Sequence, residues 1–135
     1  MQEVTASRVV DASPVVVSHW LEPATVVEAE GSFTVETIDE RADATIVVAS
    51  GPGMHLPLRF EERDDGLYYT QEGEQGPFAH METWIDVEDV TDGTRVTFRS
   101  SVSLAAPLPF GDRIAAWKRK GELTRALESL EAELG

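Results

Sequence analysis

Residues 110–134 read FGDRIAAWKRKGELTRALESLEAEL, and this stretch predicts how the whole chain is built. Apolar or small residues recur at steps of three or four, the spacing that aligns side chains along one stripe of an α-helix. The stripe consists of Phe110, Ile114, Trp117, Gly121, Thr124, Leu127, Leu130 and Leu134. The opposite face is charged: Asp112, Arg113, Lys118, Arg119, Glu122, Arg125, Glu128 and Glu131. A helix of about 24 residues is roughly 35 Å long, so its stripe needs a partner surface elsewhere in the chain.

The preceding residues predict that surface as a β-sheet. Residues 5–10 are rich in β-branched and apolar residues and predict a first strand. Ser13 and Pro14 suit the N-cap and first position of a short helix that ends near Leu21, and residues 24–28 predict one more short helical turn. From Ser32 onward apolar and polar residues alternate, and turn signals separate successive runs. We therefore predict an α+β fold in which a curved seven-stranded antiparallel sheet surrounds the long C-terminal helix.

Composition narrows the protein class. A chain of 135 residues fits a single domain spanning residues 1–135. Its net charge of −14, from 25 acidic and 11 basic residues, opposes binding to nucleic acid or anionic membranes. The acidic residues are spread along the chain, which suggests adaptation to a salty cytoplasm and hence a halophile. The chain has no cysteine, no signal-like start and no apolar run of membrane length, so we expect a cytoplasmic protein.

Three local motifs resemble the START/Bet v-type (SRPBCC) superfamily, in particular its polyketide cyclase/dehydrase-like branch. They are VDASP at residues 10–14, DGTRVT at residues 92–97, and PLPF at residues 107–110 leading into the final helix. The chain departs from the branch at Ser18, where an aromatic residue is usual, and it lacks a Trp-Pro step after the first helix. The resemblance implies a helix-grip fold with an apolar cavity between sheet and helix. It also implies that the cavity binds hydrophobic small molecules, with chemistry in only some members.

The predicted cavity is the main candidate site, because clefts of this kind usually bind ligands. Gly121 lies in the middle of the long helix, where glycine costs roughly 1 kcal/mol relative to alanine. It either allows a ligand or strand to approach closely or simply packs against the sheet. The candidate lining, each member of which is also an ordinary core residue, is Phe33, Val35, Leu56, Leu58, Phe60, Ile85, Phe98, Ile114, Trp117 and Gly121.

Arg8 is a candidate for binding an oxyanion if its strand face points inward, because a guanidinium donates paired hydrogen bonds. The alternative, which we favour, is that Arg8 is solvated or paired with a surface acid. His80 and Glu82 are two residues apart on a strand and form a candidate acid–base pair. The alternative, also favoured, places them on the outer face with Trp84, opposite the apolar side of that strand.

The sequence leaves three functions open. The favoured one is binding of a hydrophobic, lipid- or polyketide-like molecule, because no ionisable group falls clearly inside the predicted cavity. The second is a cyclase or dehydratase acting on a carbonyl compound. The third is a module that dimerises through the outer sheet face around Trp84. We expect a monomer or homodimer without cofactor. His19, His55 and His80 lack metal-ligand spacing, so no metal site is expected.

Overall fold

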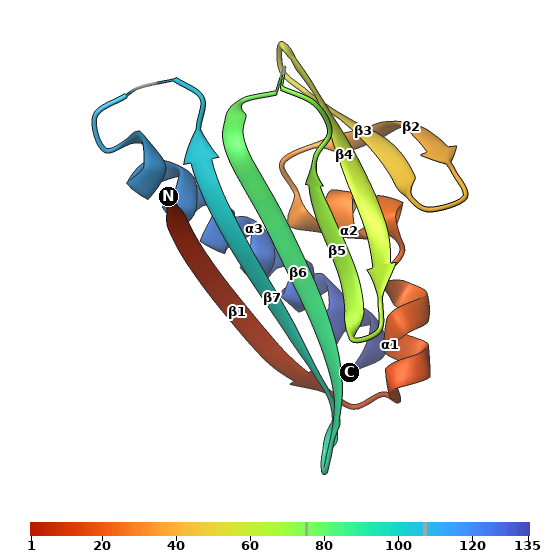
Figure 1. The fold of residues 1–135 in the computed structure, drawn as a ribbon. Coiled ribbons are helices and arrows are strands. Elements are labelled where there is room, and N and C mark those ends of the chain that lie inside the picture. Colours follow the sequence, from red (N-terminus) through yellow and green to blue (C-terminus); the bar gives the residue numbers. More distant parts are fainter. Residues whose placement is uncertain (75, 107) are drawn as a thin grey trace.

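The computed structural model describes residues 1–74, 76–106 and 108–135, which form seven strands and three helices (Figure 1). Gln75 and Pro107, the latter part of the PLPF motif, lie outside the described residues. The elements in chain order are β1 (Gln2–Val10), α1 (Pro14–Trp20), α2 (Pro23–Glu30), β2 (Thr34–Glu40), β3 (Thr45–Gly51), β4 (Met54–Arg63), β5 (Gly66–Gln71), β6 (Phe78–Val90), β7 (Gly93–Leu104) and α3 (Gly111–Leu134).

The strands form one antiparallel sheet in the order β1-β7-β6-β5-β4-β3-β2. β2 to β7 pair with their neighbours in sequence, and β1 joins the free edge of β7. The predicted α+β helix-grip fold is therefore confirmed: a seven-stranded antiparallel sheet, two short helices after the first strand, and a long C-terminal helix. None of the described helices combines the length and the apolar character needed to cross a bilayer.

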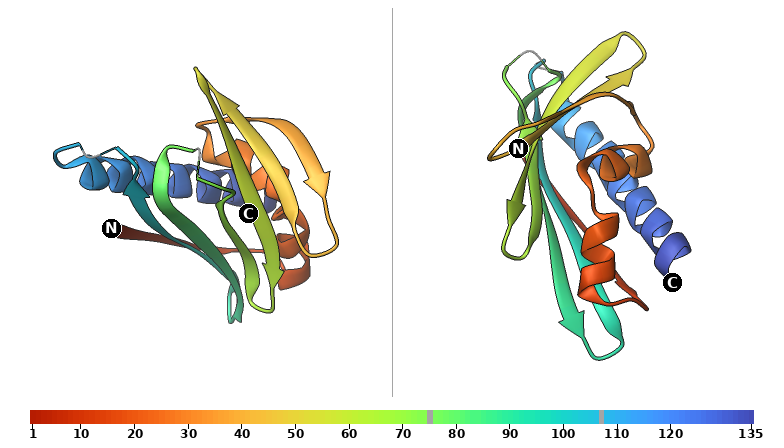
Figure 2. Two further views of the ribbon diagram at one scale, coloured as in Figure 1. Left: turned by 45° about the horizontal axis from the view of Figure 1, so that its top comes forward. Right: turned by 90° about the vertical axis from the view of Figure 1, so that its right-hand side faces the viewer.

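The three helices cover one face of the sheet, with α3 running along it, α2 lying toward β2 and β3, and α1 toward β6 and β7 (Figure 2). α3 packs against β1, β7 and α2. Its C-terminal half closes the core with Leu123, Leu127 and Leu130, which are fully buried. They belong to the same hydrophobic core as apolar side chains from the inward face of the sheet, such as Phe98.

The predicted helix stripe is wrong in the N-terminal half of α3. Phe110, Ile114 and Trp117 are 71%, 62% and 79% exposed, whereas Arg119 and Glu122 are buried. The helix turns the side of Arg119 and Glu122 toward the sheet, because polar groups there form hydrogen bonds and ion pairs with Arg119, which in turn pairs with Glu122. Periodicity treats charged residues as solvated, and it therefore selected the wrong face for these first three turns.

Gly121 is also placed differently from the prediction. A Cβ atom built on it would meet only the Arg125 side chain, 3.5 Å away, so neither a strand nor the cavity requires glycine there. Its interpretation as a point of close ligand or strand approach is wrong.

The start of α1 matches the sequence pattern. Pro14 is its first residue, and the Ser13 hydroxyl accepts a hydrogen bond from the backbone N–H of Val16 at 3.4 Å. Because N-cap side chains satisfy otherwise unpaired donors, Ser13→Ala is expected to lower the free energy of unfolding by about 1 kcal/mol in urea denaturation. Ser13→Asn keeps a capping oxygen and serves as the control. Its free energy of unfolding is expected to fall much less than that of Ser13→Ala. Equal losses in both variants would contradict the capping role.

Candidate functional site

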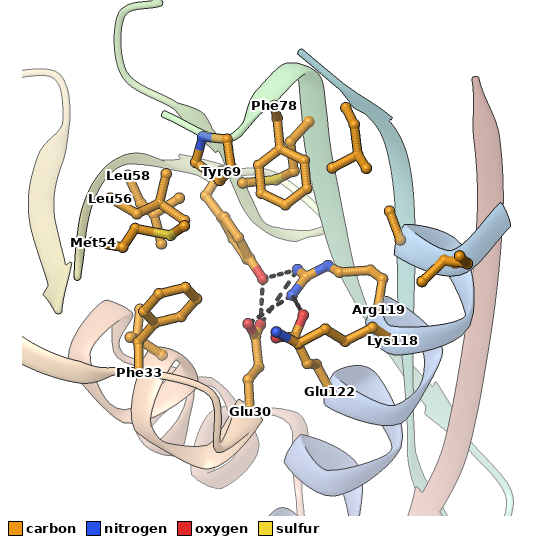
Figure 3. Close-up of a pocket in the computed structure, with 16 residues that line it drawn as sticks. Glu30, Phe33, Met54, Leu56, Leu58, Tyr69, Phe78, Lys118, Arg119 and Glu122 are labelled. Atoms are coloured by element: carbon orange, nitrogen blue, oxygen red, sulfur yellow. Dashed lines mark hydrogen bonds and ion pairs between the residues drawn. The ribbon is translucent and has the colours of Figure 1, made fainter. Parts of the chain in front are cut away.

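A cavity of about 240 Å³ lies between α3, the end of α2 and the inward face of the sheet (Figure 3). It exceeds the roughly 150 Å³ that accommodates benzene in an engineered protein, so it has room for a small organic molecule. Its walls are mainly apolar, with charged groups gathered on one side. The lining residues are Val27, Glu30, Phe33, Met54, Leu56, Leu58, Tyr69, Pro77, Phe78, Met81, Leu104, Ile114, Ala115, Lys118, Arg119 and Glu122.

The charged side of the cavity is organised around Arg119. Its Nη1 donates to Glu30 Oε1 at 2.8 Å and to Glu122 Oε1 at 3.0 Å. Its Nη2 donates to the Tyr69 hydroxyl, which in turn donates to Glu30 Oε2. Figure 3 shows these four side chains converging from α2, β5 and α3. We call Glu30, Tyr69, Arg119 and Glu122 the polar cluster.

Two hydroxyl groups from the sheet complete the contacts of Arg119. Nη2 donates to Thr83 Oγ1 at 2.8 Å, and Nε donates to Ser100 Oγ at 3.0 Å. The two hydroxyls lie 2.9 Å apart on the paired strands β6 and β7, both fully buried. A buried guanidinium is tolerable only when its donors are satisfied, and here the sheet supplies acceptors where most inward positions are apolar.

The end of α2 places Glu30 at the cavity. Glu30 is the last residue of the helix, and Gly31 ends it with a φ of 84° in the left-handed region. The Arg125 side chain covers this turn: its Nε donates to the Glu30 carbonyl oxygen at 2.9 Å. A Cβ at Gly31 would come within 2.8 Å of the same nitrogen. Glycine thus permits both the helix end and the close contact with α3 that points Glu30 inward.

Burial shapes the protonation states of the polar cluster. It raises the pKa of Glu30 above its ordinary value, although the nearby Arg119 opposes this shift. Burial also raises the pKa of Tyr69, so the phenol stays protonated and can donate to Glu30. Burial alone would lower the pKa of Arg119, but Glu30, Tyr69 and Glu122 hold it well above its usual value. The site therefore contains a permanent cation, a neutral phenol and carboxylates able to accept hydrogen bonds.

The predicted lining residues divide into two groups. Those that line the cavity are Phe33, Leu56, Leu58 and Ile114. Of the others, Phe60, Ile85 and Phe98 are fully buried in the core, and Val35 packs against it. Trp117 faces solvent on the far side of α3, so its placement in the cavity wall is wrong.

The catalytic candidates predicted from the sequence, Arg8, His80 and Glu82, do not line the cavity. Arg8 is partly exposed, with its Nε 3.9 Å from Glu131 Oε1, in agreement with the surface pairing favoured from the sequence. His80 Nε2 lies 3.0 Å from Glu82 Oε1 on the face of β6 opposite the buried Met81, Thr83 and Ile85.

The outer face of the sheet carries Trp84, and the histidines do not gather with acidic residues into groups of three or more in the described structure. Trp84 lies on the same outer face of β6. The guanidinium carbon of Arg99 packs over its indole, 4.0 Å from the centre of the Trp84 ring. Within the described part of the chain, no three His, Asp or Glu side chains gather in a way that would hold a metal ion.

Sequence reasoning missed the whole polar cluster. A usable signal was present in α3, where Arg119 continues the row of Ala116, Leu123 and Leu127 at steps of three or four. A charged residue in an otherwise apolar row indicates a buried partner. Nothing local in the sequence identified Glu30 or Tyr69 as that partner.

Comparison with known proteins gave one family match. A profile described as "Polyketide cyclase / dehydrase and lipid transport" matches residues 1–135. No curated protein sequence matched.

Several solved structures share the fold. A protein from Thermus thermophilus is 21% identical, with 97% of this chain and 95% of that chain covered and a TM-score of 0.71. A START superfamily protein from Mycobacterium smegmatis is 10% identical, with 98% and 96% covered and a TM-score of 0.73. The Zhui aromatase/cyclase from a Streptomyces species is 13% identical, with 98% and 92% covered and a TM-score of 0.79. These identities are too low to show more than a common fold.

Proposed function

The chain belongs to the polyketide cyclase/dehydrase and lipid transport family, and on this basis we propose that it binds a hydrophobic small molecule in the cavity between the sheet and α3. The observation that carries the proposal is the cavity itself, whose apolar walls include Phe33, Leu56 and Leu58. Apolar walls with a few converging polar groups are the usual make-up of a small-molecule site. The walls provide affinity through burial of apolar surface, and the polar cluster orients the ligand.

A direct test uses naphthalene, an apolar probe without polar groups. Naphthalene is expected to bind the wild-type chain, and Ala115→Trp is expected to weaken binding at least tenfold, because Ala115 lines the cavity and an indole there would occupy it. Ala132→Trp adds the same side chain at an exposed position of α3 and should bind like wild type. Titrations in molar KCl are suitable because salt screens the repulsion within a chain of net charge −14.

Two results would contradict this function: no naphthalene binding by a folded wild-type chain, or equal binding by Ala115→Trp. Native mass spectrometry of the chain purified from its own source is an independent measurement, because a ligand that co-purifies with the chain is detected directly by its mass.

A cyclase or dehydratase is the second candidate function, and Glu30 is the observation that favours it. Its carboxyl group faces the cavity, its pKa is raised by burial, and it accepts a hydrogen bond from the Tyr69 phenol. A carboxylate with a raised pKa is a suitable general base for a carbon acid beside a carbonyl group. Analysis of the bound ligand after prolonged incubation separates the two functions, because a binding protein returns it unchanged.

A further inference from the structure

Arg119 has no donor left for a ligand. A guanidinium carries five N–H groups, and the structure gives Arg119 six hydrogen-bond contacts with protein atoms. The acceptors come from the Glu30 and Glu122 carboxylates and from three hydroxyl groups. A ligand carboxylate or enolate could gain Arg119 only by displacing one of these buried acceptors, which would then be unpaired.

The acceptor capacity of the cluster is, by contrast, incompletely used. A carboxylate offers about four lone-pair positions. Glu30 accepts three hydrogen bonds, two from Arg119 and one from Tyr69. Glu122, within the described structure, accepts one hydrogen bond, from Arg119 to its Oε1. Both residues line the cavity, so Glu122 is the group with the most capacity to accept a hydrogen bond from a ligand.

The charges of the polar cluster also disfavour an anionic ligand. Two carboxylates face one guanidinium within the polar cluster, and all three groups are buried. An anionic ligand group would add a further negative charge where little water screens it. Lys118 is the other cation in the described lining, but its side chain is exposed, so its charge is largely solvated.

We propose that the cavity selects an apolar ligand whose polar group donates a hydrogen bond, such as an alcohol, a phenol or an amine, with Glu122 as the acceptor. Carboxylates and other anions are disfavoured. This inference rests on the proposed binding function, because it concerns the orientation of a ligand already inside the cavity. It specifies which chemical class the apolar walls and the polar cluster accept together.

The test compares three probes of nearly the same size on the wild-type chain: 2-naphthol, 2-methoxynaphthalene and 2-naphthoate. The naphthol donates a hydrogen bond, the methyl ether cannot, and the naphthoate carries a negative charge. Because a hydrogen bond to a charged acceptor is worth roughly tenfold or more in affinity, the naphthol is expected to bind at least about tenfold more tightly than the ether. The naphthoate is expected to bind more weakly than either.

Glu122→Gln tests the assignment to one residue. The amide oxygen can still accept from Arg119, while its NH₂ group replaces the free carboxylate oxygen with a donor. The advantage of naphthol over the methyl ether is therefore expected to fall about tenfold, towards equal affinity. Glu128→Gln removes the same charge from an exposed position of α3 and should keep the wild-type order.

The outcomes separate this inference from the function on which it rests. If naphthalene binds but 2-naphthoate or the ether equals 2-naphthol on the wild-type chain, the inference is overturned and the binding function stands. If no probe binds, the binding function fails and the inference fails with it. The wild-type comparison remains decisive even if Glu122→Gln does not fold. A folded Glu122→Gln that keeps the full naphthol preference would remove Glu122 as the acceptor and overturn the assignment.

Discussion

Replacing Arg119 with methionine is expected to lower the free energy of unfolding by about 3–5 kcal/mol at neutral pH, because the substitution leaves buried carboxylates without their cation. Arg119 is 5% exposed and forms the ion pairs to both Glu30 and Glu122, at 2.8 and 3.0 Å. A domain of this size is stable by only about 5–15 kcal/mol in total, so the variant should be severely weakened. Urea denaturation of the two chains side by side measures the difference.

The decrease in unfolding free energy caused by Arg119→Met should become smaller as the pH falls. Burial raises the pKa of Glu30 above its ordinary value of 4.5, and Arg119 is the main influence that lowers it. Without Arg119 that pKa rises further. A group whose pKa is raised on folding destabilises the folded state at high pH, and this cost disappears once the pH falls below its unfolded value. The penalty of Arg119→Met is therefore expected to be smaller near pH 5 than near pH 7.

The matched control is Arg113→Met, which removes the same kind of side chain from an exposed position of the same helix. Its effect is expected to stay within about 0.5 kcal/mol. A loss below about 1 kcal/mol for Arg119→Met at neutral pH, or a loss that grows on acidification, would show that the cluster is not held together by charge.

Stability alone gives little reason for such a cluster. Well-packed apolar residues of similar volume often replace a buried ion network without loss, whereas removing one member is costly. In this chain the cluster lies at the cavity wall, not in the closed core formed by Leu123, Leu127 and Leu130. Its place beside the empty volume is consistent with a role in orienting a ligand, which is the role assigned to Glu122 above.

The sheet could be predicted from sequence because its signals are local. Alternation of apolar and polar residues marks each strand, and turn signals such as those at residues 64–66 and 91–93 join neighbours into hairpins. The same alternation directs Leu56 and Leu58 of β4 to the inward face, where they line the cavity together with Phe33, which precedes β2. A position along a strand, once its face is known, specifies the direction of the side chain.

The polar cluster could not be predicted in this way, because it depends on contacts between distant segments. Glu30 and Arg119 are 89 residues apart, and Tyr69 reaches them from the sheet. The row Ala116, Arg119, Leu123 and the row Ile114, Trp117, Gly121 have the same helical spacing, so period alone cannot choose between them. Only the partners of Arg119 decide which row is buried.

Leu127 and Trp117 together test that choice of row. Both belong to the apolar stripe predicted from the sequence. If that stripe were buried along its whole length, substitution at either position would strongly lower the free energy of unfolding. The structure expects them to differ, because Leu127 is fully buried and Trp117 is 79% exposed. Leu127→Ala should lower the free energy of unfolding by about 2–5 kcal/mol, through lost burial and the cavity left behind.

Trp117→Gln removes a much larger apolar side chain, yet its effect on the free energy of unfolding should stay within about 0.5 kcal/mol, since the indole is already in water. Urea denaturation of both variants under the same salt conditions provides the comparison. A loss of about 2 kcal/mol or more for Trp117→Gln would mean that the helix is rotated from its position in the structure. Trp117 would then face the sheet, Arg119 and Glu122 would face solvent, and the cavity would lose the polar wall on which its ligand preference depends.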